Sequence, residues 1–154
     1  MDLSSAKKAA IRLLTVRDRT AFEIRNRLSE KYSQEIVEEA LDYLTEMDFV
    51  NDERYAQNYV ENRNRTRPTG NSALRYELSN KGITSDIVDK VLNPPEAELE
   101  LAVRLLTSRA PSLARLSPEV RQRRAYGLLE RRGFPWHTAQ KAVGQVLDSD
   151  LQKD

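Results

Sequence analysis

The chain has 154 residues, of which 39% are apolar and 32% charged, and its formal net charge is +1. It has no cysteine, which excludes a disulfide framework, a thiolate metal site and a cysteine nucleophile. No apolar run approaches the roughly 20 residues that span a bilayer, and the N-terminus lacks the apolar stretch of a signal peptide, so we expect a soluble cytoplasmic protein.

The first predicted unit covers residues 5–49. Ile36, Val37, Ala40 and Leu41 follow the i, i+1, i+4, i+5 spacing of a helix, and Thr20 with Glu23 forms a capping-box pattern. We predict three helices, at about residues 5–17, 21–31 and 34–47.

The second predicted unit covers residues 50–93 and repeats the first. Leu78 corresponds to Leu28, each with an apolar residue four positions before it and a lysine three positions after it. Gly82 comes next, where a helix often ends in a left-handed residue. The predicted helices are at about residues 52–65, 71–81 and 85–92.

The third predicted unit covers residues 94–148, with Leu129 and Gly133 in register with Leu78 and Gly82. Ser117 followed by Pro118 is typical of a helix start. The predicted helices are at about residues 95–109, 118–132 and 136–147, with "APSLARLSP" as a long loop between the first two.

Together these patterns predict an all-α fold made of three tandem three-helix repeats that resemble helix-turn-helix modules. No stretch alternates with period two over more than a few residues. A unit of about 45 residues has a marginal core by itself, so we expect the units to pack on one another in an elongated array.

Charge alternates in blocks along the repeats. The segment from Lys7 to Lys31 has eight basic and three acidic residues, whereas Ile36 to Glu53 has seven acids and no base. Arginine outnumbers lysine 18 to 7, and its planar fork suits contacts to phosphate and carboxylate. Solvated helix faces are the simpler interpretation of any single block.

No pattern indicates an enzyme. The nucleotide-binding glycine motifs and the nucleophile elbow are absent, and the single histidine, His137, is expected to be an exposed residue of a helix start. We predict a binding protein without catalytic residues, cofactor or metal.

The basic residues are the candidate contacts for such a partner. Middle helices rich in arginine fit phosphate, while acidic third helices fit a protein, so a mixed target of protein and nucleic acid is favoured. The candidates are Arg25, Arg63, Arg65, Arg67, Arg75, Arg121, Arg123 and Arg124. For each, a solvated surface arginine is the alternative, and Tyr55 and Tyr59 are expected to pack rather than to stack on bases.

Several segments resemble the RecX family, regulators of the RecA recombinase. The resemblance extends from about Ala6 to Leu147, and "DERYAQNYV", residues 52–60, followed by a basic cluster carries it most clearly. "AIRLLTVRDRTAFEIRNRL", "ALRYELSNKGI" and "LLERRGF" add to it. The chain departs from the family at Trp136 and His137, where charged residues are common.

The resemblance implies a non-enzymatic regulator that lies in the groove of the RecA–DNA filament and lowers its growth, ATP hydrolysis and strand exchange. Such a role belongs to homologous recombination, DNA repair and the SOS response. It also implies weak binding to single- and double-stranded DNA, and we expect a monomer that does not bind membranes. Two other functions remain open: an array that binds DNA directly, such as a transcription factor, and a helical adaptor without nucleic acid.

Overall fold

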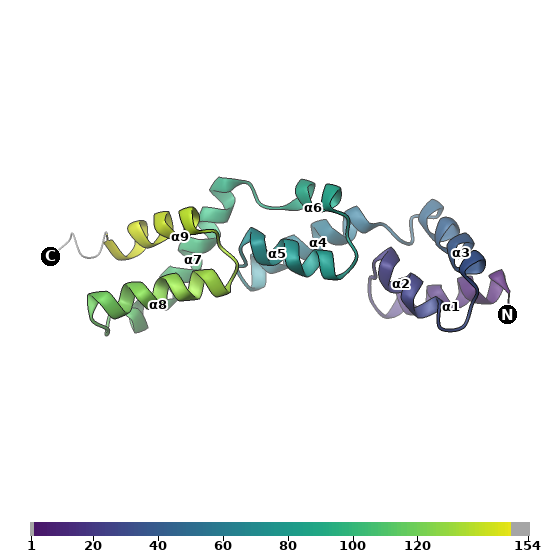
Figure 1. Cartoon of the computed structure of the whole chain (residues 1–154), viewed down its shortest axis with the longest axis horizontal. Coiled ribbons are helices and arrows are strands. Elements are labelled where there is room, and N and C mark those ends of the chain that lie inside the picture. The colour runs from purple at the N-terminus through teal and green to yellow at the C-terminus, as the bar shows by residue number, and fades with distance from the viewer. Residues whose placement is uncertain (1, 149–154) are drawn as a thin grey trace. The chain divides into compact units, whose positions relative to one another are not determined.

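The computed structural model describes residues 2–148. Within this range the chain is all-helical, with nine α-helices and a closing π-helical turn, and it has no strand (Figure 1). The predicted all-α fold of three tandem three-helix repeats is therefore confirmed.

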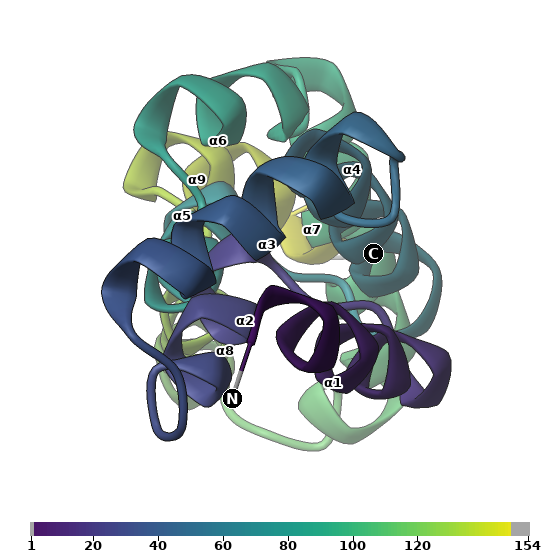
Figure 2. The ribbon, with the colours of Figure 1, turned by 90° about the vertical axis from the view of Figure 1, so that its right-hand side faces the viewer.

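The first repeat packs its three helices around a common core. Its helices are α1 (Leu3–Val16), α2 (Ala21–Leu28) and α3 (Gln34–Glu46), which Figures 1 and 2 both show side by side. Ala6 and Ala10 of α1, Ile24 and Leu28 of α2, and four residues of α3 are buried together. The small alanines let α1 approach the other two helices closely.

The second repeat is divided between two compact units. Its helices are α4 (Asp52–Thr66), α5 (Asn71–Asn80) and α6 (Ser85–Val91). One unit combines Met1–Tyr59 with Leu78–Val91, and the other combines Val60–Glu77 with the chain from Leu92 onward. The first half of α4 and the last residues of α5 thus belong to the unit of the first repeat, and the rest of both helices belongs to the unit of the third.

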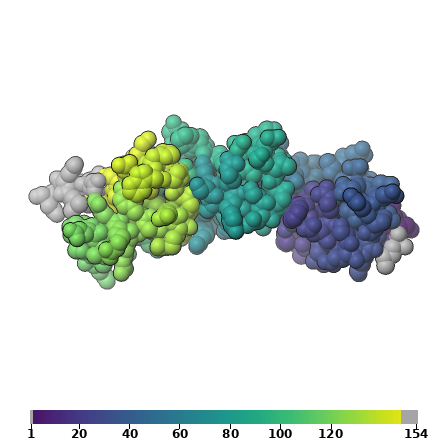
Figure 3. Space-filling view, in the orientation of Figure 1, coloured from purple at the N-terminus to yellow at the C-terminus, as the bar shows by residue number. Residues whose placement is uncertain are grey.

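The third repeat contains the longest described helix, α7. They are α7 (Pro95–Leu113), α8 (Pro118–Arg131) and α9 (Trp136–Val143), followed by the π-helical turn Gly144–Asp148. Figure 3 shows the green and yellow surfaces of α8 and α9 in direct contact. Leucines of α7, Ala125 and Leu129 of α8, and Phe134 form its core with α9.

The helix α7 continues beyond its predicted end. The segment "APSLARLSP" was predicted as a loop, but its first four residues belong to the last turn of α7, with Pro111 inside the helix. Leu113 is buried in the core of the third repeat, and the Ala114 N–H donates to the Ala110 carbonyl at 2.9 Å. Burial of Leu113 therefore outweighs the single hydrogen bond that Pro111 cannot donate.

The apolar stripe of each middle helix is buried as predicted. Its members are Ile24, Leu28, Leu74, Leu78, Ala125 and Leu129, and none is more than 2% exposed. Positions i and i+4 lie on one helix face, so each pair anchors its helix to the helices on either side.

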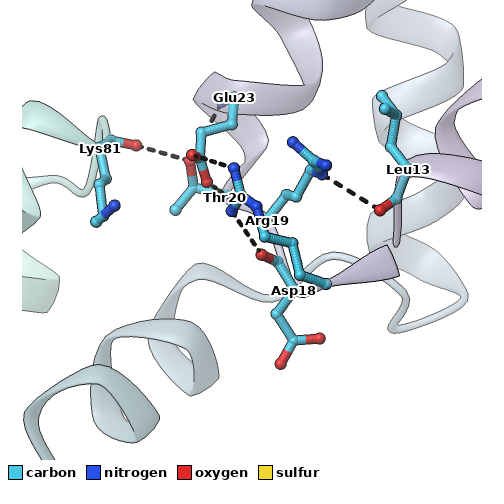
Figure 4. Close-up of polar contacts among 7 residues, drawn as sticks. Leu13, Asp18, Arg19, Thr20, Glu23 and Lys81 are labelled. Carbon is cyan, nitrogen blue, oxygen red and sulfur yellow. Dashed lines mark hydrogen bonds and ion pairs between the residues drawn. The ribbon is translucent and has the colours of Figure 1, made fainter. Parts of the chain in front are cut away.

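A polar joint fastens the first repeat to the second (Figure 4). The Thr20 hydroxyl accepts the Glu23 N–H at 3.2 Å and donates to the Lys81 carbonyl, beyond the end of α5, at 2.6 Å. The N–H of Ala21, the first residue of α2, donates to the Asp52 carboxylate at 2.9 Å. The N-terminus of α2 is thus capped both from within its own repeat and by the next one.

An equivalent joint fastens the second repeat to the third. The Asn71 N–H, at the start of α5, donates to the Glu98 carboxylate of α7 at 2.6 Å. The Gly70 N–H donates to the carbonyl of Arg132, at the end of α8, at 2.7 Å. In both joints, an acidic residue from the first helix of the later repeat caps the middle helix of the earlier repeat. The start of that middle helix also contacts the residue just after the middle helix of the later repeat.

At each joint, a glycine that follows the later middle helix lets the chain approach the start of the earlier middle helix closely. Gly82 and Gly133 have φ of +83° and +85°, as the sequence predicts for residues that end a helix. A Cβ on Gly82 would lie 2.1 Å from the Phe22 Cβ, and one on Gly133 would lie 2.3 Å from the Ala73 Cβ. The first repeat has Tyr32 instead, whose N–H donates to the Leu28 carbonyl at 2.9 Å.

We expect Gly82→Ala to lower the free energy of unfolding by at least about 2 kcal/mol, because left-handed strain and overlap with Phe22 add together. Urea unfolding followed by circular dichroism measures the change. Gly127→Ala is the matched control, since Gly127 lies inside α8 with only the mobile end of Arg131 nearby; it should be neutral or stabilising. Equal effects of the two variants would contradict the joint.

We expect Thr20→Val to lower the free energy of unfolding by about 1–3 kcal/mol, because it removes the helix cap and leaves the Lys81 carbonyl without this donor. Thr20→Ser retains the hydroxyl and should recover most of the loss, apart from the buried methyl group. The same unfolding measurement compares the two, and equal losses would show that the hydroxyl is unimportant.

Candidate functional site

The segment Asp52–Val60, which carries the family resemblance, has a structural role. Asp52 caps α2, and Arg54 donates to the Asp48 carboxylate at 2.6 Å and to its carbonyl at 3.0 Å. These two hydrogen bonds hold Asp48, which follows the C-cap of α3. Among residues 2–148, Asp48 is the non-glycine residue with a positive φ. The motif therefore builds the connection between two repeats.

The two tyrosines of this segment are half-buried and pack as expected. The rings of Tyr55 and Tyr59 are stacked with centroids 6.4 Å apart, and the Lys81 ammonium lies 5.7 Å from the Tyr59 ring centroid. These contacts place both rings at the joint between the first and second repeats.

Arg25 is exposed on α2 but is paired within the protein. Its Nε donates to Glu38 of α3 at 2.7 Å, and a second guanidinium nitrogen lies 3.4 Å from the other carboxylate oxygen. The hydrogen bond raises the pKa of Arg25 and lowers that of Glu38. A partner that binds Arg25 must compete with this forked contact.

The three candidates near the end of α4 differ in their surroundings. Arg63 is half-buried and donates to Glu77 of α5 at 2.9 Å, so it fastens two helices together. Arg65 is exposed and donates to the Asn62 side chain at 3.0 Å, and Arg67 is exposed just beyond the helix. Arg75 is exposed on α5.

Arg121 closes the end of α7. Its guanidinium donates to the carbonyls of Leu113, Ala114 and Leu116 at 3.1, 3.3 and 3.0 Å. These acceptors belong to the negative end of a helix dipole, which a cation stabilises. Arg123 and Arg124, on the same helix as Arg121, are exposed and remain the candidates of the third repeat.

Arg132, at the end of α8, is half-buried, and one of its guanidinium nitrogens donates to the Pro68 carbonyl at 3.0 Å. Burial, followed by the positive charges of Arg67 and Arg109, lowers the pKa of Arg132. Arg67 lies in the α4–α5 connection and Arg109 in α7, so no spacing along the chain predicts this electrostatic interaction.

Exposed acidic residues are most frequent on α3, whereas α8 carries more exposed arginines than acids. Glu35, Glu39, Asp42 and Glu46 are exposed on α3. Among residues 2–148, no group of three or more histidine, cysteine, aspartate and glutamate side chains is arranged to hold a metal ion. No helix in the same range is long and apolar enough to cross a membrane.

The fold and the separated charges define a tandem three-helix-repeat protein with charged surfaces of both signs. Its three repeats match the models of the first, second and third three-helix domains of RecX over residues 6–44, 51–92 and 96–143, respectively. The chain belongs to the RecX family of regulatory proteins.

Similar proteins cover nearly the whole chain. The regulatory protein RecX of Mycolicibacterium smegmatis is 33% identical over 96% of this chain and 82% of its own length. That of Chlorobium phaeobacteroides is 30% identical over 96% and 97%, respectively. The crystal structure of RecX from Lactobacillus salivarius has 25% identity and a TM-score of 0.87 over 94% of this chain and 96% of that one.

We expect Arg121→Gln to lower the free energy of unfolding by about 1–3 kcal/mol, because carbonyls at the end of α7 lose a charged donor. Arg124→Gln removes one exposed charge from the same helix and should change stability by less than about 0.5 kcal/mol. Urea unfolding of both variants measures the difference. Similar values would show that the cap of α7 does not depend on Arg121.

Proposed function

We propose that this protein binds the filament that the RecA recombinase forms on DNA and lowers its ATP hydrolysis, growth and strand exchange. Membership of a family of regulatory proteins supports a regulatory role, and the resemblance described above links that family to RecA. The observation that carries the proposal is the repetition of one three-helix unit three times, each copy with exposed charged side chains.

A repeated unit suits a periodic target. A filament offers the same protein surface at regular intervals, together with the phosphates of the DNA. One chain that contacts several subunits gains affinity because the later contacts form within an existing complex. No individual contact then needs to be strong.

The exposed arginines are the proposed contacts. Arg65, Arg67, Arg109, Arg123 and Arg124 are exposed. Arg25, Arg63, Arg121 and Arg132 already donate to groups beyond their own helix, so we assign them structural contacts first. The exposed acids of α3 fit basic patches on the protein part of the filament.

The proposal extends to DNA, location and oligomeric state. Binding to naked single- and double-stranded DNA is proposed to be weak, because the acidic helices repel phosphate. Since RecA acts on chromosomal DNA, the proposed site of action is the cytoplasm. The acting form is proposed to be a monomer.

The test is ATP hydrolysis by RecA on single-stranded DNA, titrated with this protein below one copy per recombinase subunit. A strong fall in hydrolysis at such ratios is the expected result. No change in hydrolysis, together with tight binding to bare duplex, would overturn the proposal in favour of an array that binds DNA directly.

The matched variants are Arg123→Gln with Arg124→Gln on α8, and Lys8→Gln with Arg12→Gln on α1. Each pair removes two exposed charges from one helix. We expect the α8 pair to raise the concentration for half-inhibition about tenfold, equivalent to about 1.4 kcal/mol, and the α1 pair to change it less than twofold. If the α8 arginines contact phosphate, the dependence of filament binding on salt falls as well.

Equal effects of the two pairs would show that net charge, rather than the α8 surface, determines binding. If the α8 variant binds the filament more weakly but its binding depends on salt as strongly as that of the unaltered protein, the α8 arginines contact protein carboxylates instead of phosphate.

A further inference from the structure

An exposed aromatic pair lies on the third repeat. Trp136, the chain's single tryptophan, is 66% exposed, yet its ring stacks on Tyr126 of α8 with centroids 4.7 Å apart and planes at 22°. Large aromatic side chains that stay exposed in an ordered position are frequent in protein interfaces. Tyr126 is half-buried and packs against the core of the repeat, but the core does not account for the exposed Trp136.

The pair forms one wall of a small pocket. Tyr126, Glu130, Phe134, Trp136 and Ala139 line a volume of about 240 Å³. This is larger than the roughly 150 Å³ cavity that holds benzene and smaller than the roughly 300–1,000 Å³ typical of ligand pockets. The pocket therefore has the size for one long side chain.

The local fold holds the pocket in place. Gly133 ends α8 in a left-handed conformation, and the Phe134 N–H donates to the Leu129 carbonyl at 3.0 Å, so buried Phe134 is fixed as the floor. Pro135 then restricts the backbone where α9 begins with Trp136. Tyr126 and Glu130 are four residues apart on α8 and so lie on one helix face.

The chemistry of the lining selects a cation. Tryptophan has the aromatic face that binds cations most strongly, and a second ring and a carboxylate stand beside it. The same carboxylate repels phosphate, which disfavours a stacking platform for nucleotides. An alkyl chain with a positive end matches both the aromatic walls and Glu130.

We propose that this pocket binds a lysine or arginine side chain of the protein partner. The inference rests on the proposed function, in which that partner is the RecA filament. It adds a protein contact of opposite sign to the exposed arginines, and it assigns a role to the exposed Trp136.

The test measures binding of the protein to RecA filaments on single-stranded DNA, by co-sedimentation, for variants of the pocket. We expect Trp136→Ala and Glu130→Gln each to raise the apparent dissociation constant at least threefold, and Trp136→Phe to have a smaller effect because it retains a ring. Phe49→Ala, which removes an aromatic side chain that is 46% exposed, and Glu119→Gln, on the same helix as Glu130, are the controls and should change it less than twofold.

The outcomes separate the two proposals. Absence of filament binding by the unaltered protein would overturn both. Binding by the unaltered protein that Trp136→Ala and Glu130→Gln leave within twofold would overturn the pocket alone. Weaker binding of Trp136→Ala to naked single-stranded DNA, with no effect of Glu130→Gln, would replace the cation by a stacked base. Far-ultraviolet circular dichroism confirms that each variant retains its helices.

Discussion

Asp52 and Glu98 each accept the N–H of the first residue of a preceding middle helix, and the connection between repeats depends on this contact. A carboxylate at the positive end of a helix is favourable. It also accepts a hydrogen bond from a backbone N–H that has no partner within the helix. Glu98 is only 4% exposed, so its charge needs this hydrogen bond. The first contact lies within one compact unit and the second within the other, so each joins part of the second repeat to a neighbouring repeat.

Sequence periodicity was sufficient to predict the units because each middle helix repeats its own local signals. The leucine register and the two glycines depend on residues within one helix, and these predictions were right. The joints were not predictable, because Thr20 and Lys81 are 61 positions apart and no pattern marks a hydroxyl for a distant carbonyl. The extension of α7 was missed because proline is a local stop signal, whereas burial of Leu113 is a property of the folded repeat.

The arginines illustrate the same limit. Composition and spacing identify where cations are plentiful, but only the folded chain distinguishes a guanidinium that completes the protein from one that faces solvent. Arg121 and Arg124 are three residues apart, yet the first caps α7 and the second is exposed. Conversely, no sequence pattern singles out Arg109, yet in the fold its charge acts on Arg132. A chain rich in arginine thus uses some of these residues to fasten its own helices and leaves others exposed.

The joint needs two groups that not every repeat supplies. One side of it needs a helix whose first residue has an N–H to donate, and α8 begins with Pro118, which has none. The other side needs a left-handed glycine after a middle helix, and the first repeat has Tyr32 in that position. The start of α8 and the end of α2 therefore lack the two groups from which both joints are made. The same three-helix unit is thus written with joint chemistry only where one repeat meets the next within residues 2–148.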